Sequence, residues 1–204
     1  MKTAIIRYNA GNIQSVAFAL ERLQAEYVVT DNPEEIAGSD RVIFPGVGQA
    51  HTTMQHLREK KLDLLIRSLR QPVLGICLGM QLLCRHSEEG NTPCIGIFNE
   101  EVKKFQADAQ HKVPHMGWNR VVYNLRNSHP ENDDLNRVQF AHTDDFYFVH
   151  SYYIPINSHT SGFCEYIKPF SAMMQKDNFL AVQFHPEKSG KAGEKILKFF
   201  LTSF

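Results

Sequence analysis

Short apolar runs alternate with helical patterns along the first half of the chain. Four of these runs lack any alternation of apolar and polar residues, which is typical of parallel strands that are covered on both faces. Between the runs, apolar residues recur at the spacing of a helix. This alternation of strand and helix predicts an α/β fold with a doubly wound, mostly parallel sheet. The four predicted strands cover residues 4–6, 27–29, 42–44 and 73–76.

The helical patterns of this half have recognisable starts and breaks. An apolar repeat over residues 16–23 predicts a helix after the first strand. Residues 31–35 predict the capped start of a second helix, because Pro33 lies near its first position. Apolar residues between positions 57 and 69 predict one helix, or two joined by a break.

The second half of the chain predicts strands joined by turns, and these would be additional antiparallel strands. Residues 124–137 are rich in Asn, Asp and Pro and predict a surface excursion. Residues 190–204 predict a closing helix, and no linker divides the chain, so we expect a single domain over residues 1–204. The predicted strands of this half are residues 95–98, 102–105, 120–123, 146–150, 172–176 and 180–184.

Charge and composition exclude several classes of protein. The 204 residues carry 22 basic and 22 acidic side chains, and no basic stripe indicates a nucleic-acid partner. The N-terminus turns polar too soon for a signal peptide, and no apolar run approaches the roughly 20 residues that span a membrane. Four cysteines without a C-x-x-C pair predict no metal site and favour reduced thiols in the cytoplasm. Of these, Cys84, Cys94 and Cys164 are expected to be small buried hydrophobic residues.

Cys77 has the sequence context of a reactive thiol. Gly75 and Gly79 bracket it at the spacing of a nucleophile elbow, the sharp strand-to-helix turn whose neighbours at plus and minus two must lack side chains. The thiolate is the reactive form, and the start of the following helix would stabilise its negative charge. The alternative is a core cysteine packed like Cys84, which the two flanking glycines disfavour.

A histidine and a carboxylate follow the last predicted strand. His185 and Glu187 are two residues apart, so in an extended segment their side chains point the same way. Pro186 enforces that extension. Glu187 can then hold one imidazole nitrogen while the other faces Cys77. A cysteine, a histidine and an acid make a catalytic triad, which predicts a hydrolase.

These motifs closely resemble those of the class I, or triad, glutamine amidotransferases, which carry G-x-C-x-G-x-Q and H-P-E. The resemblance implies a flavodoxin-like amidotransferase fold and hydrolysis of L-glutamine to glutamate and ammonia through a thioester on Cys77, with no metal and no organic cofactor. Further blocks resemble the branch of the family that forms a heterodimer in histidine biosynthesis and delivers ammonia to a separate cyclase, which is a (β/α)₈ barrel. These blocks are Tyr8 and residues 11–15, 45–48, 114–119 and 150–153.

The resemblance also implies roles for individual residues. The backbone N–H of Leu78 would be one donor of the oxyanion hole, and the second would come from Val47 and Gly48. Gln81 and Tyr152 could instead be packing residues, and a lone tryptophan is by default a core residue. The implied substrate-binding residues are Gln81, Glu89, His150, Ser151 and Tyr152, and the implied partner-interface residues are Trp118, Asn119 and Lys188.

Two alternatives remain open at this level. One is the glutaminase of another pathway, such as pyridoxal phosphate or anthranilate synthesis. The other is a non-catalytic regulatory subunit that keeps the fold, which the presence of all three triad residues disfavours.

Overall fold

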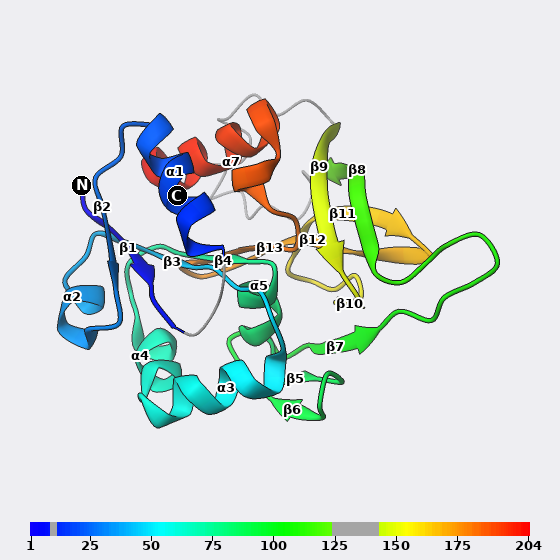
Figure 1. The fold of residues 1–204 in the computed structure, drawn as a ribbon, viewed down its shortest axis with the longest axis horizontal. Helices are drawn as coiled ribbons and strands as arrows, with labels where there is room; N and C mark the ends of the chain where they lie inside the picture. Colours follow the sequence, from blue (N-terminus) through cyan, green and yellow to red (C-terminus); the bar gives the residue numbers. More distant parts are fainter. Residues whose placement is uncertain (9–11, 124–142) are drawn as a thin grey trace.

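A nine-stranded mixed sheet organises the computed structural model, which describes residues 1–8, 12–123 and 143–204 (Figure 1). Its first five strands are parallel to one another and the remaining four run antiparallel. In spatial order the strands are β2 (Tyr27–Thr30), β1 (Thr3–Ile6), β3 (Arg41–Phe44), β4 (Val73–Ile76), β13 (Phe179–Val182), β12 (Lys168–Lys176), β11 (Thr160–Tyr166), β8 (His115–Tyr123) and β9 (Thr143–His150).

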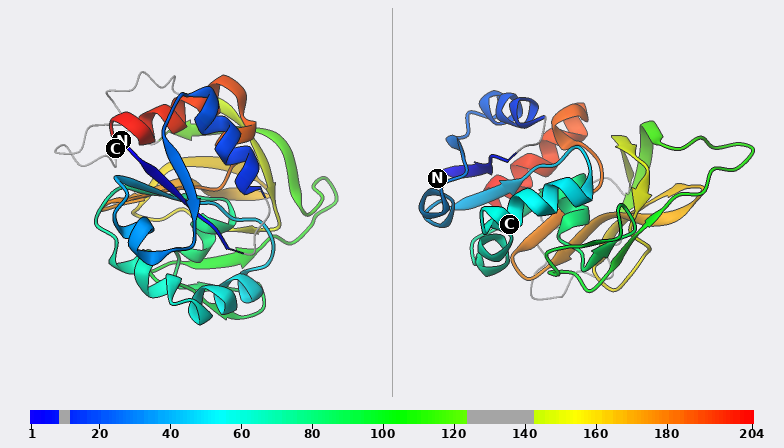
Figure 2. Two further views of the ribbon diagram at one scale, coloured as in Figure 1. Left: turned by 60° about the vertical axis from the view of Figure 1, so that its left-hand side comes forward. Right: turned by 60° about the horizontal axis from the view of Figure 1, so that its bottom comes forward.

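Helices cover both faces of the parallel half, as a doubly wound sheet requires (Figures 1 and 2). Neighbouring residues of one strand serve opposite faces: Ile5 packs into one hydrophobic core, and Ala4 and Ile6 into the other. The predicted fold class is therefore confirmed. One face carries α1 (Ile13–Arg22) and α7 (Gly190–Thr202), and the other carries α2 (Pro33–Ala37), α3 (Ala50–Glu59), α4 (Leu62–Ser68) and α5 (Leu78–Leu82).

The predicted helix starts and breaks are found in the structure. The side chain of Asn32 accepts hydrogen bonds from the backbone N–H groups of Glu34 and Glu35, which caps α2. The apolar repeat over residues 57–69 forms two helices, because Lys61 adopts a left-handed φ of 56° that ends the α-helical path between α3 and α4.

The second half is mostly antiparallel, as expected, and it contains more strands than the sequence predicted. β7 (Glu101–Lys104), β8, β9 and β12 include most of the expected segments, but β11 and three two-residue strands were not predicted. A smaller sheet packs beside the main one. Its strands are, in order, β10 (Tyr152–Tyr153), β7, β5 (His86–Ser87) and β6 (Thr92–Pro93).

The prediction of a strand over residues 95–98 is wrong. The backbone N–H groups of Ile95 and Phe98 donate to the carbonyls of Leu82 and Leu83 at the end of α5. Gly96 has a φ of 80°, outside the range of a strand. The segment caps a helix, so Ile95 and Phe98 are buried although the segment pairs with no strand in the described part of the chain.

Two other expectations concern the cysteines and the polar excursion. Cys84 and Cys164 are buried as predicted, whereas Cys94 is only half-buried, and all four cysteines are free thiols. The excursion predicted over residues 124–137 lies outside the described residues.

Candidate active site

Cys77 stands at a strained turn between β4 and α5. Its φ of 54° and ψ of −109° are unusual for a residue with a side chain, and such conformations cost about 1–3 kcal/mol. The flanking glycines have no room for a Cβ: one added to Gly75 would lie 2.7 Å from Leu83 Cδ1, and one on Gly79 would lie 2.0 Å from the carbonyl oxygen of Phe44. The G-x-C-x-G spacing is thus a steric requirement of this turn.

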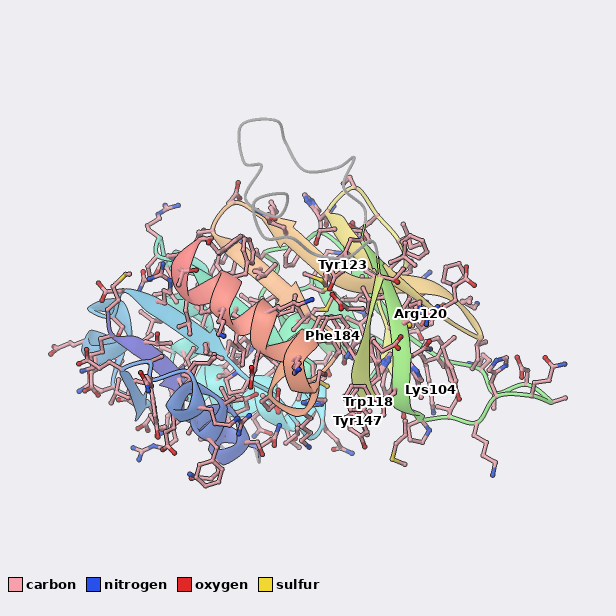
Figure 3. The ribbon with its side chains drawn as sticks, turned by 90° about the horizontal axis from the view of Figure 1, so that it is seen from above. Lys104, Trp118, Arg120, Tyr123, Tyr147 and Phe184 are labelled. Atoms are coloured by element: carbon pink, nitrogen blue, oxygen red, sulfur yellow. The ribbon has the colours of Figure 1, made fainter. Side chains whose placement is uncertain are left out.

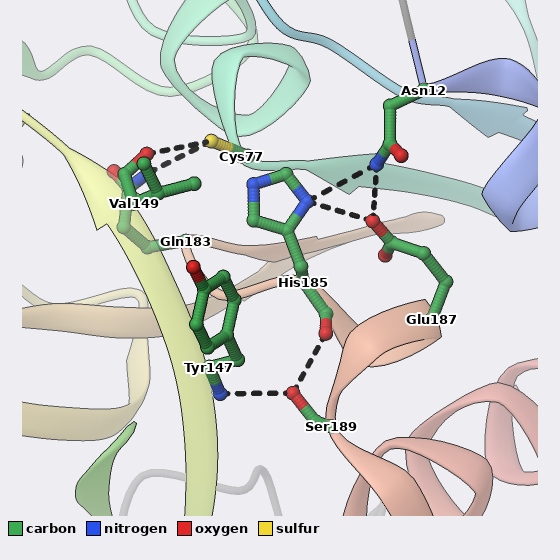
Figure 4. Close-up of polar contacts among 8 residues, drawn as sticks. All are labelled: Asn12, Cys77, Tyr147, Val149, Gln183, His185, Glu187 and Ser189. Carbon is green, nitrogen blue, oxygen red and sulfur yellow. Dashed lines mark hydrogen bonds and ion pairs between the residues drawn. The ribbon is translucent and has the colours of Figure 1, made fainter. Parts of the chain in front are cut away.

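His185 and Glu187 form a buried pair beside Cys77. Strand β13 is the parallel neighbour of β4, so the residues that follow the two strands meet at one edge of the sheet. Nδ1 of His185 donates to Oε1 of Glu187 at 2.7 Å, and both side chains are almost completely buried. Nε2 of His185 faces Cys77 (Figure 4) and has no hydrogen-bond partner in the described part of the chain.

The electrostatics of this cluster favour a charged imidazole. Burial alone would lower the pKa of His185, but the negative charges of Cys77 and Glu187 outweigh it and raise that pKa to about 10. A protonated His185 therefore lies beside the sulfur of Cys77, where it can stabilise negative charge that develops during attack on a substrate.

Asn12 joins the cluster without having been singled out as a catalytic candidate. It is the N-cap of α1, yet its side chain makes no capping bond, and its φ of 73° turns it toward the histidine. Its Nδ2 donates to Oε1 of Glu187 and lies 3.5 Å from Nδ1 of His185 (Figure 4). An asparagine before a helical pattern is ordinarily interpreted as a cap, so no local signal distinguishes this contact.

Ser189 contacts the backbone of the same histidine. Its hydroxyl donates to the backbone carbonyl of His185 at 2.7 Å and accepts from the backbone N–H of Tyr147 at 3.0 Å (Figure 4). The short 3₁₀ helix Pro186–Lys188 carries Glu187 between these anchors.

A pocket of about 390 Å³ opens beside Cys77, within the range of small-molecule sites. It brings together all the residues that the resemblance implied for glutamine binding and the oxyanion hole. Its lining is Val47, Gly48, Cys77, Leu78, Gln81, Glu89, Pro114, Val149, His150, Ser151 and Tyr152.

Two glutamines connect the pocket wall to the thiol. Nε2 of Gln81 donates to the carbonyl of Tyr152 at 3.1 Å and to Oε1 of Gln183 at 2.9 Å. Nε2 of Gln183 in turn lies 3.7 Å from Sγ of Cys77. Gln183 had no predicted role, because a polar residue near the end of a predicted strand has many ordinary explanations.

Glu89 and His150 already have protein partners. Oε2 of Glu89 accepts from the backbone N–H of Ala50 at 2.7 Å, at the start of α3. The imidazole of His150 uses both nitrogens, with Nδ1 2.7 Å from the carbonyl of Tyr152 and Nε2 2.9 Å from Nδ1 of His115.

The oxyanion segment is packed against the elbow. A Cβ on Gly46 would lie 2.6 Å from the backbone nitrogen of Gly79, so only glycine permits this approach. The backbone N–H of Leu78 donates to the carbonyl of Gly46 at 3.3 Å. One of the two expected oxyanion donors is therefore engaged within the protein in this conformation.

The proposed interface residues lie on or near the surface. Trp118 is 60% exposed, so the core interpretation of this residue is wrong. It projects from β8 beside Tyr147 of β9, with the ring centroids 6.2 Å apart (Figure 3). Asn119 is half-buried and Lys188 is exposed.

The described residues include neither a cluster of metal-binding side chains nor a membrane-spanning helix. Over residues 1–8, 12–123 and 143–204, no group of three or more His, Cys, Asp or Glu side chains is arranged to hold a metal ion. Within the same residues no helix is both long and apolar enough to cross a bilayer.

The class of this protein follows from its fold and its site. The fold is a doubly wound sheet, and the site combines a cysteine on a strained turn, a histidine–carboxylate pair and an adjoining pocket. The chain belongs to the family Glutamine amidotransferase class-I, whose model matches residues 4–204.

The names of similar proteins are more specific than the family. The imidazole glycerol phosphate synthase subunit HisH of Bacteroides fragilis is 57% identical, over 98% of this chain and 99% of that protein. The subunit of the same name from Escherichia coli K12 is 46% identical, with the same coverage of both chains. Among solved structures, a glutamine amidotransferase from Thermotoga maritima has a TM-score of 0.63 at 15% identity, covering 98% of this chain and 82% of that one, which shows a shared fold.

Proposed function

We propose that this chain is the glutaminase subunit of imidazole glycerol phosphate synthase, a single domain over residues 1–204 that supplies ammonia to a cyclase. The observation that carries the proposal is the buried His185–Glu187 pair, in which Nε2 of His185 faces Cys77 on its strained turn. The names of the relatives favour this pathway over pyridoxal phosphate or anthranilate synthesis. The reaction belongs in the cytoplasm, where the thiol stays reduced.

The first half-reaction forms a thioester. The thiolate of Cys77 attacks the side-chain carboxamide carbon of glutamine, and the carbonyl oxygen becomes a tetrahedral oxyanion. His185 carries the proton from the thiol and gives it to the departing nitrogen, so the C–N bond breaks and ammonia leaves. Glu187 holds the imidazolium in place through Nδ1.

The second half-reaction releases glutamate. His185, now neutral, removes a proton from a water molecule that attacks the thioester carbon. The C–S bond then breaks, and the thiolate and imidazolium are restored. Ammonia passes to the cyclase, which joins it to a phosphoribulosyl formimino nucleotide and forms imidazole glycerol phosphate and an aminoimidazole carboxamide ribotide.

Glutamine recognition needs groups for an ammonium, a carboxylate and a carboxamide. Oε1 of Glu89 has no donor among the described residues and suits the ammonium. Oε1 of Gln81 is likewise without a donor in the described part of the chain, because the amide nitrogen makes both hydrogen bonds of this side chain. Ser151 and Tyr152 also line the pocket.

The partner regulates the oxyanion hole in this proposal. The N–H of Leu78 is engaged by Gly46, and the neighbouring Gly48 has a φ of 111°, a conformation that glycine adopts freely. Rotation of residues 46–48 would release the Leu78 N–H and aim that of Val47 at the oxyanion. We infer that the (β/α)₈ cyclase docks at Trp118, Asn119 and Lys188 as a heterodimer and favours this rotation.

Glutamate release tests the proposal. The purified chain is assayed with glutamine alone, then with the cyclase and its nucleotide ligand, beside Cys77→Ala. Low activity alone, a rise of about a hundredfold or more in the complex and none in the variant are expected, since one oxyanion donor contributes about 10²–10³-fold. Full activity without a partner would refute the regulation, and no glutamate under any condition would indicate a non-catalytic subunit.

A further inference from the structure

Two buried histidines that take no part in the proposed chemical steps lie on the neighbouring strands β8 and β9. His115 and His150 are directly opposite each other in the register of the two strands. Their exposed fractions are 3% and 6%, and Nδ1 of His115 lies 2.9 Å from Nε2 of His150. A buried pair of titratable groups costs stability unless its hydrogen bonds are all made, so the partners of all four ring nitrogens matter.

The hydrogen bonds around the pair have one consistent direction. The carbonyl of Tyr152 only accepts, so Nδ1 of His150 must donate to it at 2.7 Å. Nε2 of a neutral His150 then accepts, and Nδ1 of His115 donates. Nε2 of His115 accepts in turn from Nδ2 of Asn119 at 3.2 Å, whose amide is oriented by its second bond, to the carbonyl of Glu165 at 3.0 Å.

The direction of this chain of bonds is stable at neutral pH. Burial lowers the pKa of His150 to about 3 and that of His115 to about 4. Both imidazoles are therefore neutral, and each has a single tautomer, with the hydrogen on Nδ1.

The inner end of the chain of bonds lies in the substrate pocket. The Tyr152 carbonyl that accepts from His150 also accepts from Nε2 of Gln81 at 3.1 Å. The second hydrogen of the Gln81 amide goes to Oε1 of Gln183 at 2.9 Å. These two acceptors determine which way the amide faces, and they leave its Oε1 to accept from a donor in the pocket.

We propose that His115 and His150 are positioning residues for glutamine. Their oriented hydrogen bonds hold the Tyr152 carbonyl in place. That carbonyl in turn orients the Gln81 amide, so that the amide oxygen faces an N–H group of the substrate. The inference rests on the glutaminase function proposed above. It adds His115 and gives His150, which the resemblance implied as a substrate-binding residue, an indirect role through its hydrogen bonds. Its direct consequence is for substrate affinity, measured as KM, with little effect on kcat.

Two substitutions at position 115 separate positioning from packing. The imidazole of His115 stacks on Tyr166 and Phe148, with ring centroids 4.0 Å and 4.9 Å away. His115→Phe keeps an aromatic ring for this stacking but removes the donor to His150. His115→Asn removes the ring but retains an N–H donor near the position of Nδ1. The control is Tyr166→Phe, which keeps the stacked ring and removes only a hydroxyl that donates to the carbonyl of Lys112.

The kinetic test measures glutamate release by each variant in the complex with the cyclase. His115→Phe is expected to raise KM for glutamine about tenfold, the factor that corresponds to one lost buried hydrogen bond, with kcat within about threefold. His115→Asn should keep KM within about threefold of wild type even though it is the less stable protein, and Tyr166→Phe should match wild type. Equal KM values for His115→Phe and wild type, or a higher KM in His115→Asn than in His115→Phe, would overturn the inference.

A spectroscopic test does not depend on activity. Long-range ¹H–¹⁵N spectra of the purified chain should show both histidines as Nδ1–H tautomers, the form that is uncommon for imidazole in water, with the His115 signals assigned by their loss in His115→Phe. An Nε2–H tautomer at either residue would overturn the inference. If the wild-type complex releases no glutamate, the proposed function fails and this inference fails with it; if it does and only the KM order is reversed, the inference alone fails.

Discussion

Gly79→Ala is the sharpest test of the turn that carries the thiol. A Cβ on Gly79 would lie 2.0 Å from the carbonyl oxygen of Phe44, where an ordinary carbon–oxygen contact is about 3.3 Å. Strand β3 and helix α5 would have to separate locally by about 1.3 Å. Both elements are buried, and Phe44 leads directly into the oxyanion segment at Gly46.

The expected cost follows from two opposing effects. Alanine in a helix gains up to about 1 kcal/mol over glycine, whereas overpacking of a rigid site costs about 3 kcal/mol or more when the obstacle is backbone. We expect a net loss of about 2–4 kcal/mol in the free energy of unfolding. With a slope of roughly 2 kcal/mol per molar urea, the midpoint of unfolding should fall by about 1–2 M.

Gly38→Ala is the matched control. Its added Cβ would lie 3.1 Å from the carbonyl oxygen of Glu34, which a shift of a few tenths of an ångström relieves, and its φ of −84° suits alanine. Both variants change the unfolded chain equally, so that contribution cancels. Gly79→Ala should also lower glutamate release about a hundredfold, since misplacement of a reacting group by about 1 Å has that effect. Equal urea midpoints for the two variants would refute the steric reasoning.

Three further predictions concern the triad and the surface. Because the pKa of His185 is raised above its unfolded value near 6.5, its charge stabilises the protein fully below that pH and the stabilisation is lost as the pH rises through about 10. Urea unfolding of wild type and His185→Gln should therefore show a stability difference that shrinks between these values, and a constant difference would contradict the charge assignment. Asn12→Gly, which keeps the left-handed backbone free of strain, should lower kcat about tenfold and leave KM within about threefold, because Glu187 loses a hydrogen bond; an unchanged kcat in the glutamate assay would remove Asn12 from the site. The emission of Trp118, the only tryptophan, should move to shorter wavelength when a tryptophan-free cyclase binds, and binding without such a shift would place the interface elsewhere.

The parallel half and the turn at Cys77 were predictable because their sequence patterns are local. An uninterrupted apolar run such as residues 42–44 suits only a strand covered on both faces, and β3 is such a strand. Gly75 and Gly79 lie within two residues of Cys77, so their spacing identified the turn, although the Phe44 carbonyl that excludes a side chain at Gly79 belongs to another strand.

The errors have a common physical origin in long-range partners. Residues 95–98 are as apolar as a strand, but their N–H groups are used by the end of α5, which no local pattern reveals. Strand β11 is rich in small and polar residues and becomes a strand only because β12 and β8 lie on its two sides. The contacts of Asn12 and His115 also join residues far apart in the chain, so the sequence contained their chemistry but not their geometry.

The pairing of β4 with β13 has a consequence for synthesis of the protein on the ribosome. Cys77 follows the fourth strand of the sheet, but the strand that completes its neighbourhood begins only at Phe179, and His185 lies within the last 20 of 204 residues. An incomplete chain therefore carries the thiol without its base and cannot release ammonia before translation is nearly finished. Until then one edge of β4 has no neighbour and is open to strands of other chains, so the nascent polypeptide is most prone to aggregate in the long interval between its first half and its last strand.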